Sequence, residues 1–494
     1  MELILDIKQL GPVKNSQVIW RPLTVFIGPN NTGKTYTAYL IHALLKTYPD
    51  RCGLSEEKIA ELFLHERLKF NFEELKKQWI EAWKKEVEER LLPNFWRDYF
   101  GIENEIPELT KLELFIEEKK KKKIEFEGEI PISGALEVDE HSLEAKEIGT
   151  LFYTARVKKD NNKLELYIPY NSQGEIIWEE EYKEAIEKEY HSFEETFCEK
   201  FACFLGFPKY NLIIPAERTA FLFYRQWFVL KNQLTQLLIE NISVKKWYKK
   251  LSSLLKYFQF PEVFEDFLTF LLFSEIKEKR RFSETYDKVI QLLEEKLLKG
   301  KIVFKKDEFW FDFGKGEIKI SGASSGVKAL LPLENFLRTA PEGAFLVIDE
   351  PEMHLHPEAQ VILAIALAMA VNLGLRVLIT THSPYILDTF NFLAWAYRIR
   401  EKIKEIGDAS LEEKFKNVLN TSPFEVSEES LIDPHHFSAY FFRMDGKVED
   451  IRKILKEIPQ VDIDWRTFAE VSDALWEKLS VLGKLQDEIL EREL

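Results

Sequence analysis

The sequence predicts an α/β fold in which a mixed sheet surrounds a phosphate-binding loop, with an antiparallel β lobe and an inserted helical subdomain. Three observations predict it. A complete phosphate-loop motif lies near the N-terminus. Two apolar strands end in polar runs near residues 349 and 380. Between the loop and these strands, residues 219–299 carry apolar side chains at helical spacing.

The phosphate-loop motif GxxxxGK[ST] occupies residues 28–35. β-branched and aromatic residues at 23–27 predict a buried strand before it, and apolar spacing over 36–46 predicts a helix after it. Glycines let the backbone approach a phosphate, and N–H groups at a helix start attract anions. The residues expected to bind nucleotide are Gly28, Pro29, Asn30, Asn31, Thr32, Gly33, Lys34 and Thr35.

Two of these residues have specific expected roles. Lys34 should reach the β- and γ-phosphates of ATP, and the Thr35 hydroxyl should bind Mg²⁺. The alternative is a Gly/Asn-rich turn that matches by chance. The agreement of strand, loop and helix argues against that alternative.

A pair of carboxylates follows the apolar run 344–348, which reads as a central parallel strand covered on both faces. In open α/β sheets, ligands bind beyond the carboxyl ends of the strands. Asp349 is therefore expected to hold Mg²⁺, and Glu350 to orient or deprotonate the attacking water. An ordinary acidic turn is the alternative, and the phosphate loop makes it the weaker one.

Two further segments carry polar residues with two possible meanings each. His382 follows the strand 377–379, where it either contacts the γ-phosphate or has a purely structural role. The run of Ser324, Ser325 and Gly326 precedes the apolar helix 327–337, which Pro332 is expected to kink. Such a run either caps the helix or binds an anion at its exposed start.

Together these motifs resemble the head of an ABC-type ATPase. Several runs are similar to the overcoming-lysogenization-defect (OLD) family and to related AAA-family defence ATPases such as Septu-type antiphage subunits: 214–218, 324–327, 349–357 and 381–384. The resemblance covers roughly residues 1–48, 205–220 and 300–390. It implies that Ser324, Ser325 and Gly326 form a signature motif acting on the ATP of a second subunit. It also implies a D-loop at 355–357 and a switch histidine at His382.

The resemblance further implies a homodimer or higher homo-oligomer that closes on ATP and Mg²⁺ and acts on a separate effector, a nuclease in antiphage defence. The signature departs from the usual sequence, and no clear glutamine loop follows the first helix. Glu217 and Arg218 are the candidates for that region, and Arg218 either binds phosphate or forms a structural salt bridge with a carboxylate. Some OLD proteins end in a Toprim nuclease. Here Asp462 and Asp464 have its spacing but no preceding apolar strand, so no Toprim domain is expected.

Composition narrows the remaining function classes. The 494-residue chain has a net charge of −16 and no apolar stretch of membrane-spanning length. No signal peptide is evident, and three scattered cysteines indicate reduced thiols, so a cytoplasmic protein is expected. Lysine-rich clusters at 119–123, 245–250 and 277–281 are either solvated surfaces or DNA contacts. The alternative function is thus a DNA-binding clamp of the repair or chromosome-structuring type.

The predicted domain organisation is a head interrupted by insertions. The head comprises residues 1–48, 205–218 and 300–445. Residues 49–204 form a helical and antiparallel β insertion, 219–299 a helical subdomain, and 446–494 a C-terminal helical tail.

Overall fold

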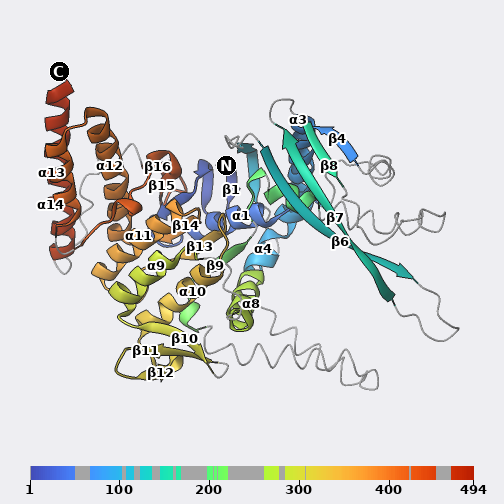
Figure 1. Cartoon of the computed structure of the whole chain (residues 1–494), viewed down its shortest axis with the longest axis horizontal. Helices are drawn as coiled ribbons and strands as arrows, with labels where there is room; N and C mark the ends of the chain where they lie inside the picture. The colour runs from blue at the N-terminus through green and yellow to red at the C-terminus, as the bar shows by residue number, and fades with distance from the viewer. Residues whose placement is uncertain are drawn as a thin grey trace. The chain divides into compact units, whose positions relative to one another are not determined.

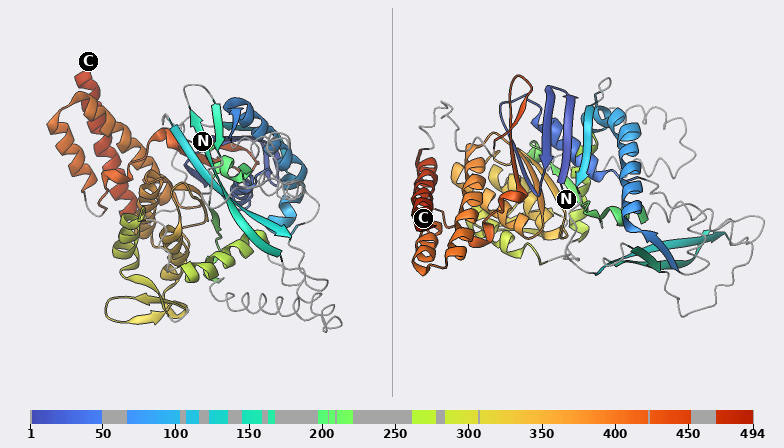
Figure 2. Two further views of the ribbon diagram at one scale, coloured as in Figure 1. Left: turned by 45° about the vertical axis from the view of Figure 1, so that its right-hand side comes forward. Right: turned by 90° about the horizontal axis from the view of Figure 1, so that it is seen from above.

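A computed structural model describes residues 2–49, 67–102, 107–115, 123–135, 145–158, 163–167, 197–203, 205–208, 210–220, 261–277, 284–305, 308–421, 424–451 and 469–493. Figures 1 and 2 show the chain from three directions. It forms two compact units. Unit 1 comprises residues 1–2, 43–94 and 112–208, and unit 2 comprises residues 3–42, 95–111 and 209–494.

Unit 2 is built on a six-stranded sheet in the order β16-β15-β3-β14-β13-β9. Its strands are β3 (Leu23–Ile27), β9 (Asn211–Ile214), β13 (Phe345–Asp349), β14 (Arg376–Thr381), β15 (Phe437–Phe442) and β16 (Val448–Asp450). The pairings from β15 to β9 are parallel, and β16 pairs antiparallel with β15 at one edge. Every residue of β13 is buried, as expected of a parallel strand covered on both faces. The predicted mixed sheet is confirmed.

Antiparallel strands flank this sheet and confirm the predicted β lobe. Strands β1 (Glu2–Leu10) and β2 (Val13–Trp20) pair as a hairpin, with β5 (Glu108–Phe115) on the other side of β1. A second antiparallel sheet precedes the signature segment: β10 (Lys301–Lys305), β11 (Glu308–Asp312) and β12 (Glu317–Lys319).

The following helices lie wholly or mostly in unit 2. They are α1 (Lys34–Lys46), α4 (Leu92–Phe100), α8 (Glu262–Lys277), α9 (Asp287–Leu292), η4 (Leu293–Leu298), α10 (Ser325–Thr339), α11 (Pro357–Asn372), α12 (Pro384–Ile406), α13 (Ala409–Leu419) and α14 (Ala469–Glu493), with short turns η5 (Ile320–Gly322), η6 (Glu428–Ser430) and η7 (Pro434–His436). Helix α10 runs unbroken through Pro332, so the interruption expected there is not found. Helix α14 packs along α12 and α13.

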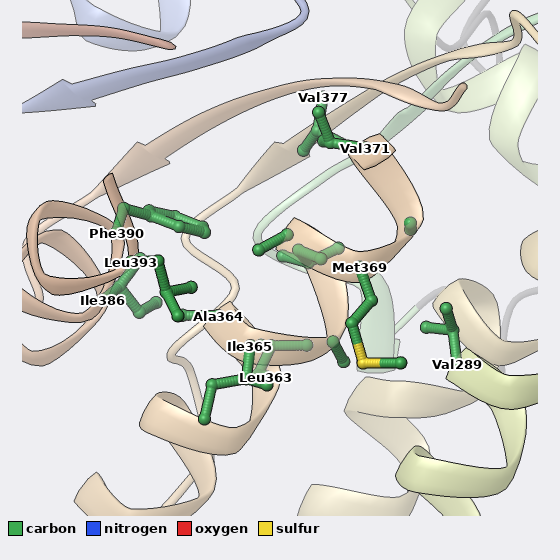
Figure 3. Close-up of a cluster of buried hydrophobic side chains, with 14 of the residues drawn as sticks. Val289, Leu363, Ala364, Ile365, Met369, Val371, Val377, Ile386, Phe390 and Leu393 are labelled. Carbon is green, nitrogen blue, oxygen red and sulfur yellow. The ribbon is translucent and has the colours of Figure 1, made fainter. Parts of the chain in front are cut away.

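Helix α11 forms the centre of the core. A helix that is apolar on all sides is buried, and nearly every residue of α11 from Val361 onward is shielded from solvent. Figure 3 shows its Ala364 beside Leu393 of α12, and its Met369 beside Val289 of α9. Helix α11 connects β13 to β14, so this packing holds the connection in place between the two strands.

Unit 1 contains a four-stranded antiparallel sheet in the order β4-β8-β7-β6. Its elements are β4 (Arg67–Asn71), α3 (Phe72–Glu86), η1 (Val87–Leu91), β6 (Lys123–Ala135), β7 (Ala145–Lys158) and β8 (Lys163–Tyr167). The sequence reads as mostly helical over 55–92, yet β4 is a strand because it pairs with β8. The rings of Trp79 and Trp83 pack edge-on against Phe207.

Among the described residues, no helix combines the length and the apolar character that crossing a membrane requires. The lysine runs at 119–122, 245–250 and 278–281, and the pair Asp462 and Asp464, lie outside the described residues.

Candidate functional site

The phosphate loop connects β3 to α1 and is wedged between two hairpins. Gly28 has φ +148°, and a Cβ there would lie 2.3 Å from the Phe442 carbonyl oxygen of β15. A Cβ on Gly33 would lie 2.6 Å from the side chain of Val13, the first residue of β2 in the β1–β2 hairpin. The two glycines are therefore required by the protein's own packing.

The loop leaves its tip open and buries its base. Pro29, Asn30 and Asn31 are exposed, whereas Thr32, Gly33 and Lys34 are buried and Thr35 is half-buried. The Thr32 hydroxyl donates a hydrogen bond to the Pro29 carbonyl at 2.8 Å, which holds the tip in a turn.

The Lys34 ammonium points back into the loop. Its Nζ donates hydrogen bonds to the carbonyls of Gly28 at 2.9 Å and Pro29 at 2.7 Å. Burial lowers the pKa of Lys34, while the negative charges of Glu350, Asp349 and Glu352 act against that shift. A buried ammonium held by two carbonyls of its own loop is suited to bind a polyanion in place of those carbonyls.

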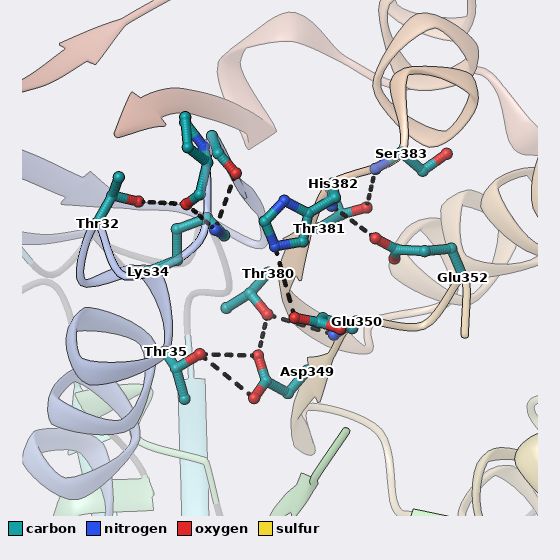
Figure 4. A network of polar contacts seen from close by, with 12 residues as sticks. Thr32, Lys34, Thr35, Asp349, Glu350, Glu352, Thr380, Thr381, His382 and Ser383 are labelled. Carbon is teal, nitrogen blue, oxygen red and sulfur yellow. Dashed lines mark hydrogen bonds and ion pairs between the residues drawn. The ribbon is translucent and has the colours of Figure 1, made fainter. Parts of the chain in front are cut away.

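Asp349 ends β13 and contacts two hydroxyl groups (Figure 4). The Thr35 hydroxyl of α1 donates to its two carboxylate oxygens at 3.1 and 3.3 Å, and the Thr380 hydroxyl of β14 donates to Oδ1. Burial raises the pKa of Asp349 to about 6, and the Thr380 hydrogen bond opposes this. Hydroxyl and carboxylate oxygens are the ligands that Mg²⁺ takes, so Thr35 and Asp349 could hold this ion.

Glu350 follows in a strained backbone conformation. Its φ of +48° is rare for a residue other than glycine. Its N–H donates to the Thr380 carbonyl at 2.9 Å. Strained residues gather at functional sites, where surrounding contacts hold them. The hydrogen bond to Thr380 is one of the contacts that hold Glu350 in this conformation.

His382 and Glu350 form a pair across neighbouring strand ends. The His382 Nε2 lies 3.5 Å from Glu350 Oε1, and both side chains are about one-third exposed, at 32% and 34%. The hydrogen bond from His382 is the largest effect that lowers the pKa of Glu350, and the charge of Lys34 adds to it. Glu350 is therefore ionised at neutral pH.

Glu352 was not singled out from the sequence, although it contacts this pair. Its Oε1 accepts a hydrogen bond at 2.6 Å from the main-chain N–H of His382. The neighbouring Ser383 caps α12 by accepting from Ile386 N–H, and its hydroxyl donates to Gln360 of α11 at 2.5 Å. Glu352 and Gln360 thus both hold the loop that carries His382, one at His382 and the other at Ser383.

The signature segment lies apart from these contacts. Ser324 caps α10 by accepting from the Val327 N–H at 3.3 Å, which confirms the N-cap pattern. Ser324 and Ser325 are exposed, and a Cβ on Gly326 would meet the His354 carbonyl at 3.4 Å. The start of α10 therefore packs against the segment predicted to precede the D-loop, and its hydroxyls face solvent.

Arg218 differs from the expectation. It follows β9 and is buried, but its hydrogen bonds go to main-chain carbonyls and not to a carboxylate or a phosphate-binding surface. The prediction that Arg218 forms a salt bridge with a carboxylate is therefore wrong, because its acceptors are main-chain carbonyls. Sequence patterns do not reveal carbonyl acceptors, since every residue has one. Glu217, beside it, is exposed.

The chain resembles several solved structures at low scores. An Smc head bound to the C-terminal winged-helix domain of ScpA is 16% identical, with 92% of this chain and 98% of that chain covered and a TM-score of 0.32. A Pyrococcus furiosus Smc head with an extended coiled coil, bound to the C-terminal domain of ScpA, is 13% identical. The match covers 92% of this chain and 97% of that chain, with a TM-score of 0.29. The Thermotoga maritima SMC head domain is 12% identical, with 78% of this chain and 90% of that chain covered and a TM-score of 0.26.

A comparison with curated proteins gives no significant match. The family model described as the AAA ATPase domain, by contrast, matches residues 5–387. That span contains the phosphate loop and both strand-end motifs, so the chain belongs to the AAA ATPase domain family and is an ATP-hydrolysing enzyme.

Proposed function

We propose that this ATPase is a nucleotide-dependent switch, in which two copies close around two ATP molecules and thereby act on a partner effector. One observation carries the proposal. Thr35, Asp349, Glu350 and His382 contact one another or a shared neighbour within one chain, whereas the serines at the start of α10 face solvent. An exposed, serine-capped helix start attracts an anion. A second chain's triphosphate is the anion that the proposal assigns to it.

Nucleotide binding is assigned to the phosphate loop. Backbone N–H groups at the start of α1 would hold the phosphates, and Lys34 would exchange its two loop carbonyls for the β- and γ-phosphates. Thr35 and Asp349 would hold Mg²⁺, whose charge neutralises the phosphate oxygens when it is bound. The buried Lys34 and the paired oxygens of Thr35 and Asp349 fit both ligands.

Hydrolysis is assigned to Glu350 and His382. An ionised carboxylate can accept a proton from a water molecule, and contact with His382 lowers the pKa of Glu350 further below neutrality. His382 is close enough to Glu350 to orient it, and its exposed edge would contact the γ-phosphate. Ser324, Ser325 and Gly326 of the other copy would close the site.

The effector is proposed on the resemblance of residues 349–357 and 214–218 to antiphage defence ATPases. The partner is a separate nuclease, which the closed ATP-bound dimer would activate or release. The DNA-binding clamp is the second candidate, and its test is simple. If salt-sensitive DNA binding is lost when Lys119, Lys120, Lys121, Lys122 and Lys123 are replaced by glutamate, the clamp function is favoured.

The central experiment compares Glu350→Gln with wild type. Single-turnover ATP hydrolysis and molecular mass by light scattering are measured with Mg-ATP and without nucleotide. The variant should hydrolyse ATP at least about 100-fold more slowly, because general base catalysis is lost. It should also accumulate as a dimer or larger assembly with ATP. The matched control is Glu358→Gln, at an exposed position in the first turn of α11.

Two results would reject the proposal. Hydrolysis at the wild-type rate would remove Glu350 from its assigned role. A slow variant that stays monomeric with saturating ATP would leave the catalytic role intact and reject the closed dimer.

A further inference from the structure

Arg218 is a buried cation that the ATP-binding scheme does not use. It lies in the turn after β9 and is 2% exposed. Burial lowers its pKa to about 10, so the guanidinium stays charged at neutral pH. Burying a charge is costly unless hydrogen bonds compensate for it. The partners of Arg218 therefore indicate its purpose.

Three of its hydrogen bonds go to the catalytic turn, defined as residues 349–351. Nη1 donates to the Asp349 carbonyl, and Nη2 donates to the carbonyls of Glu350 and Pro351, each at 3.2 Å. Two longer bonds, at 3.4 Å, go to its own turn at Pro215 and Ala216. The guanidinium thus fixes the backbone that carries both catalytic carboxylates.

The remaining hydrogen bond of Arg218 goes to α10, the helix that begins in the signature segment and is called the signature helix below. Nε donates to the Ala329 carbonyl of α10 at 3.1 Å. Close packing lies beside this hydrogen bond, since a Cβ on Gly326 would come within 3.4 Å of the His354 carbonyl, three residues after the catalytic turn. Arg218 therefore connects the catalytic turn directly to α10.

The strain in the catalytic turn gives this connection a function. Glu350 has φ +48°, a conformation that is unfavourable for a residue other than glycine and persists only when neighbours hold it. The carbonyl of Glu350 is one of the groups that Arg218 holds. A lysine could not replace it, because an ammonium lacks the planar fork that reaches several acceptors at once.

We infer that Arg218 is a positioning residue that holds the catalytic turn in the conformation that directs Glu350, and that ties this conformation to α10. The inference rests on the proposed role of Glu350. It assigns Arg218 to the hydrolysis step and not to the binding of nucleotide. Changes in the catalytic turn on hydrolysis would reach the signature helix through this side chain.

The test separates binding from hydrolysis in Arg218→Lys. Affinity for a fluorescent ATP analogue with Mg²⁺ should stay within about threefold of wild type, while single-turnover hydrolysis slows about 100-fold, as expected for a misplaced catalytic group. The matched control is Arg338→Lys, on α10, whose guanidinium donates hydrogen bonds to the carboxylates of Glu334 and Glu294. The control should hydrolyse ATP at the wild-type rate.

A double variant tests whether Arg218 acts through Glu350. In a Glu350→Gln background, adding Arg218→Lys should slow hydrolysis by less than about threefold, because residues that act as a unit are not additive. Additive losses, or normal hydrolysis by Arg218→Lys alone, would overturn the inference. If Glu350→Gln alone hydrolyses ATP normally, the catalytic role proposed for Glu350 is rejected. Slow hydrolysis by Arg218→Lys in that case would still show that Arg218 holds the catalytic turn in its active conformation.

A measurement without any change at Arg218 covers the case in which Arg218→Lys does not fold. Hydrogen exchange is followed in Glu350→Gln as ATP is added. Residues 323–333 and 349–357 should gain protection at the same ATP concentration. Protection of 349–357 alone would show that the two segments are not tied, and the inference would be wrong.

Discussion

The Thr35 hydroxyl lies 3.1 Å from a carboxylate oxygen of Asp349, although 314 positions separate the two residues in the chain. This contact joins the start of α1 to the end of β13. Both side chains offer oxygen atoms to a metal ion. Thr35 lies in the first turn of α1 and Asp349 at the end of β13, so regular secondary structure holds the pair in place. A rigid oxygen pair next to a buried lysine is the core of the site.

Removal of the Thr35 hydroxyl should weaken the dependence of hydrolysis on Mg²⁺. In Thr35→Ala, the Mg²⁺ concentration needed for half-maximal turnover should rise at least about tenfold, because one proposed ligand is lost. Thr35→Ser keeps the hydroxyl and serves as the control. Equal Mg²⁺ titrations for the two variants would contradict the assignment of Thr35 as a ligand.

Gly28→Ala should destabilise the fold even without nucleotide. The added Cβ would meet the Phe442 carbonyl oxygen at 2.3 Å, in a conformation with φ +148°. We expect a loss of about 2–4 kcal/mol in the free energy of unfolding. Urea denaturation measures it, with Gly322→Ala as the control, since no atom lies within 4 Å of a Cβ there. Normal stability with weakened ATP binding would show that Gly28 serves the phosphate alone.

Mixing two inactive variants should restore activity if the signature acts between chains. Lys34→Ala disables the phosphate loop, and Ser325→Arg blocks the start of α10. A mixed dimer contains one site with an intact loop from one chain and an intact signature from the other. An equimolar mixture should therefore recover roughly a quarter of wild-type turnover, since half of the dimers are mixed and each has one of two sites. No recovery would argue for a signature that acts within its own chain.

Asp388→Asn should stabilise the protein at neutral pH. Burial raises the pKa of this α12 carboxyl to about 6. Between its unfolded pKa near 4 and the folded value, the native state binds more protons, so stability falls as pH rises through this window. Above pH 6 the cost of the buried charge remains in full. The asparagine variant should gain about 2 kcal/mol at pH 7.5 and less than half of that at pH 4.5.

Chemical denaturation at the two pH values checks this prediction. Asp487→Asn, at an exposed position of α14, is the control and should change stability at neither pH. An equal gain for Asp388→Asn at both pH values would mean that packing, and not charge, explains it.

The catalytic strand ends could be predicted because each motif is local. The apolar run before Asp349 specifies a buried parallel strand, and parallel strands place their carboxyl ends at one edge of the sheet. Once β13 and β14 are neighbours, Asp349 and Thr380 are register partners, and Glu350 and His382 follow them. The sequence pattern therefore predicted most of the residues that meet in Figure 4.

Residues that act through the backbone could not be predicted. Arg218 binds carbonyls, and Gly28 is required by the approach of β15, whose pairing with β3 depends on a segment more than 400 residues away. Strand β4 was missed for the same reason, because its partner β8 is distant in sequence. Such features depend on which segments meet, and local periodicity does not encode that.

The position of β3 has a consequence for biosynthesis. Its two neighbours in the sheet, β14 and β15, are translated much later, and β15 ends at Phe442. At 5–20 residues per second, β3 leaves the ribosome on the order of 20–80 s before its second partner exists. The nascent N-terminal segment thus carries an unpaired apolar strand throughout most of translation, and it is during this interval that the polypeptide most needs a chaperone.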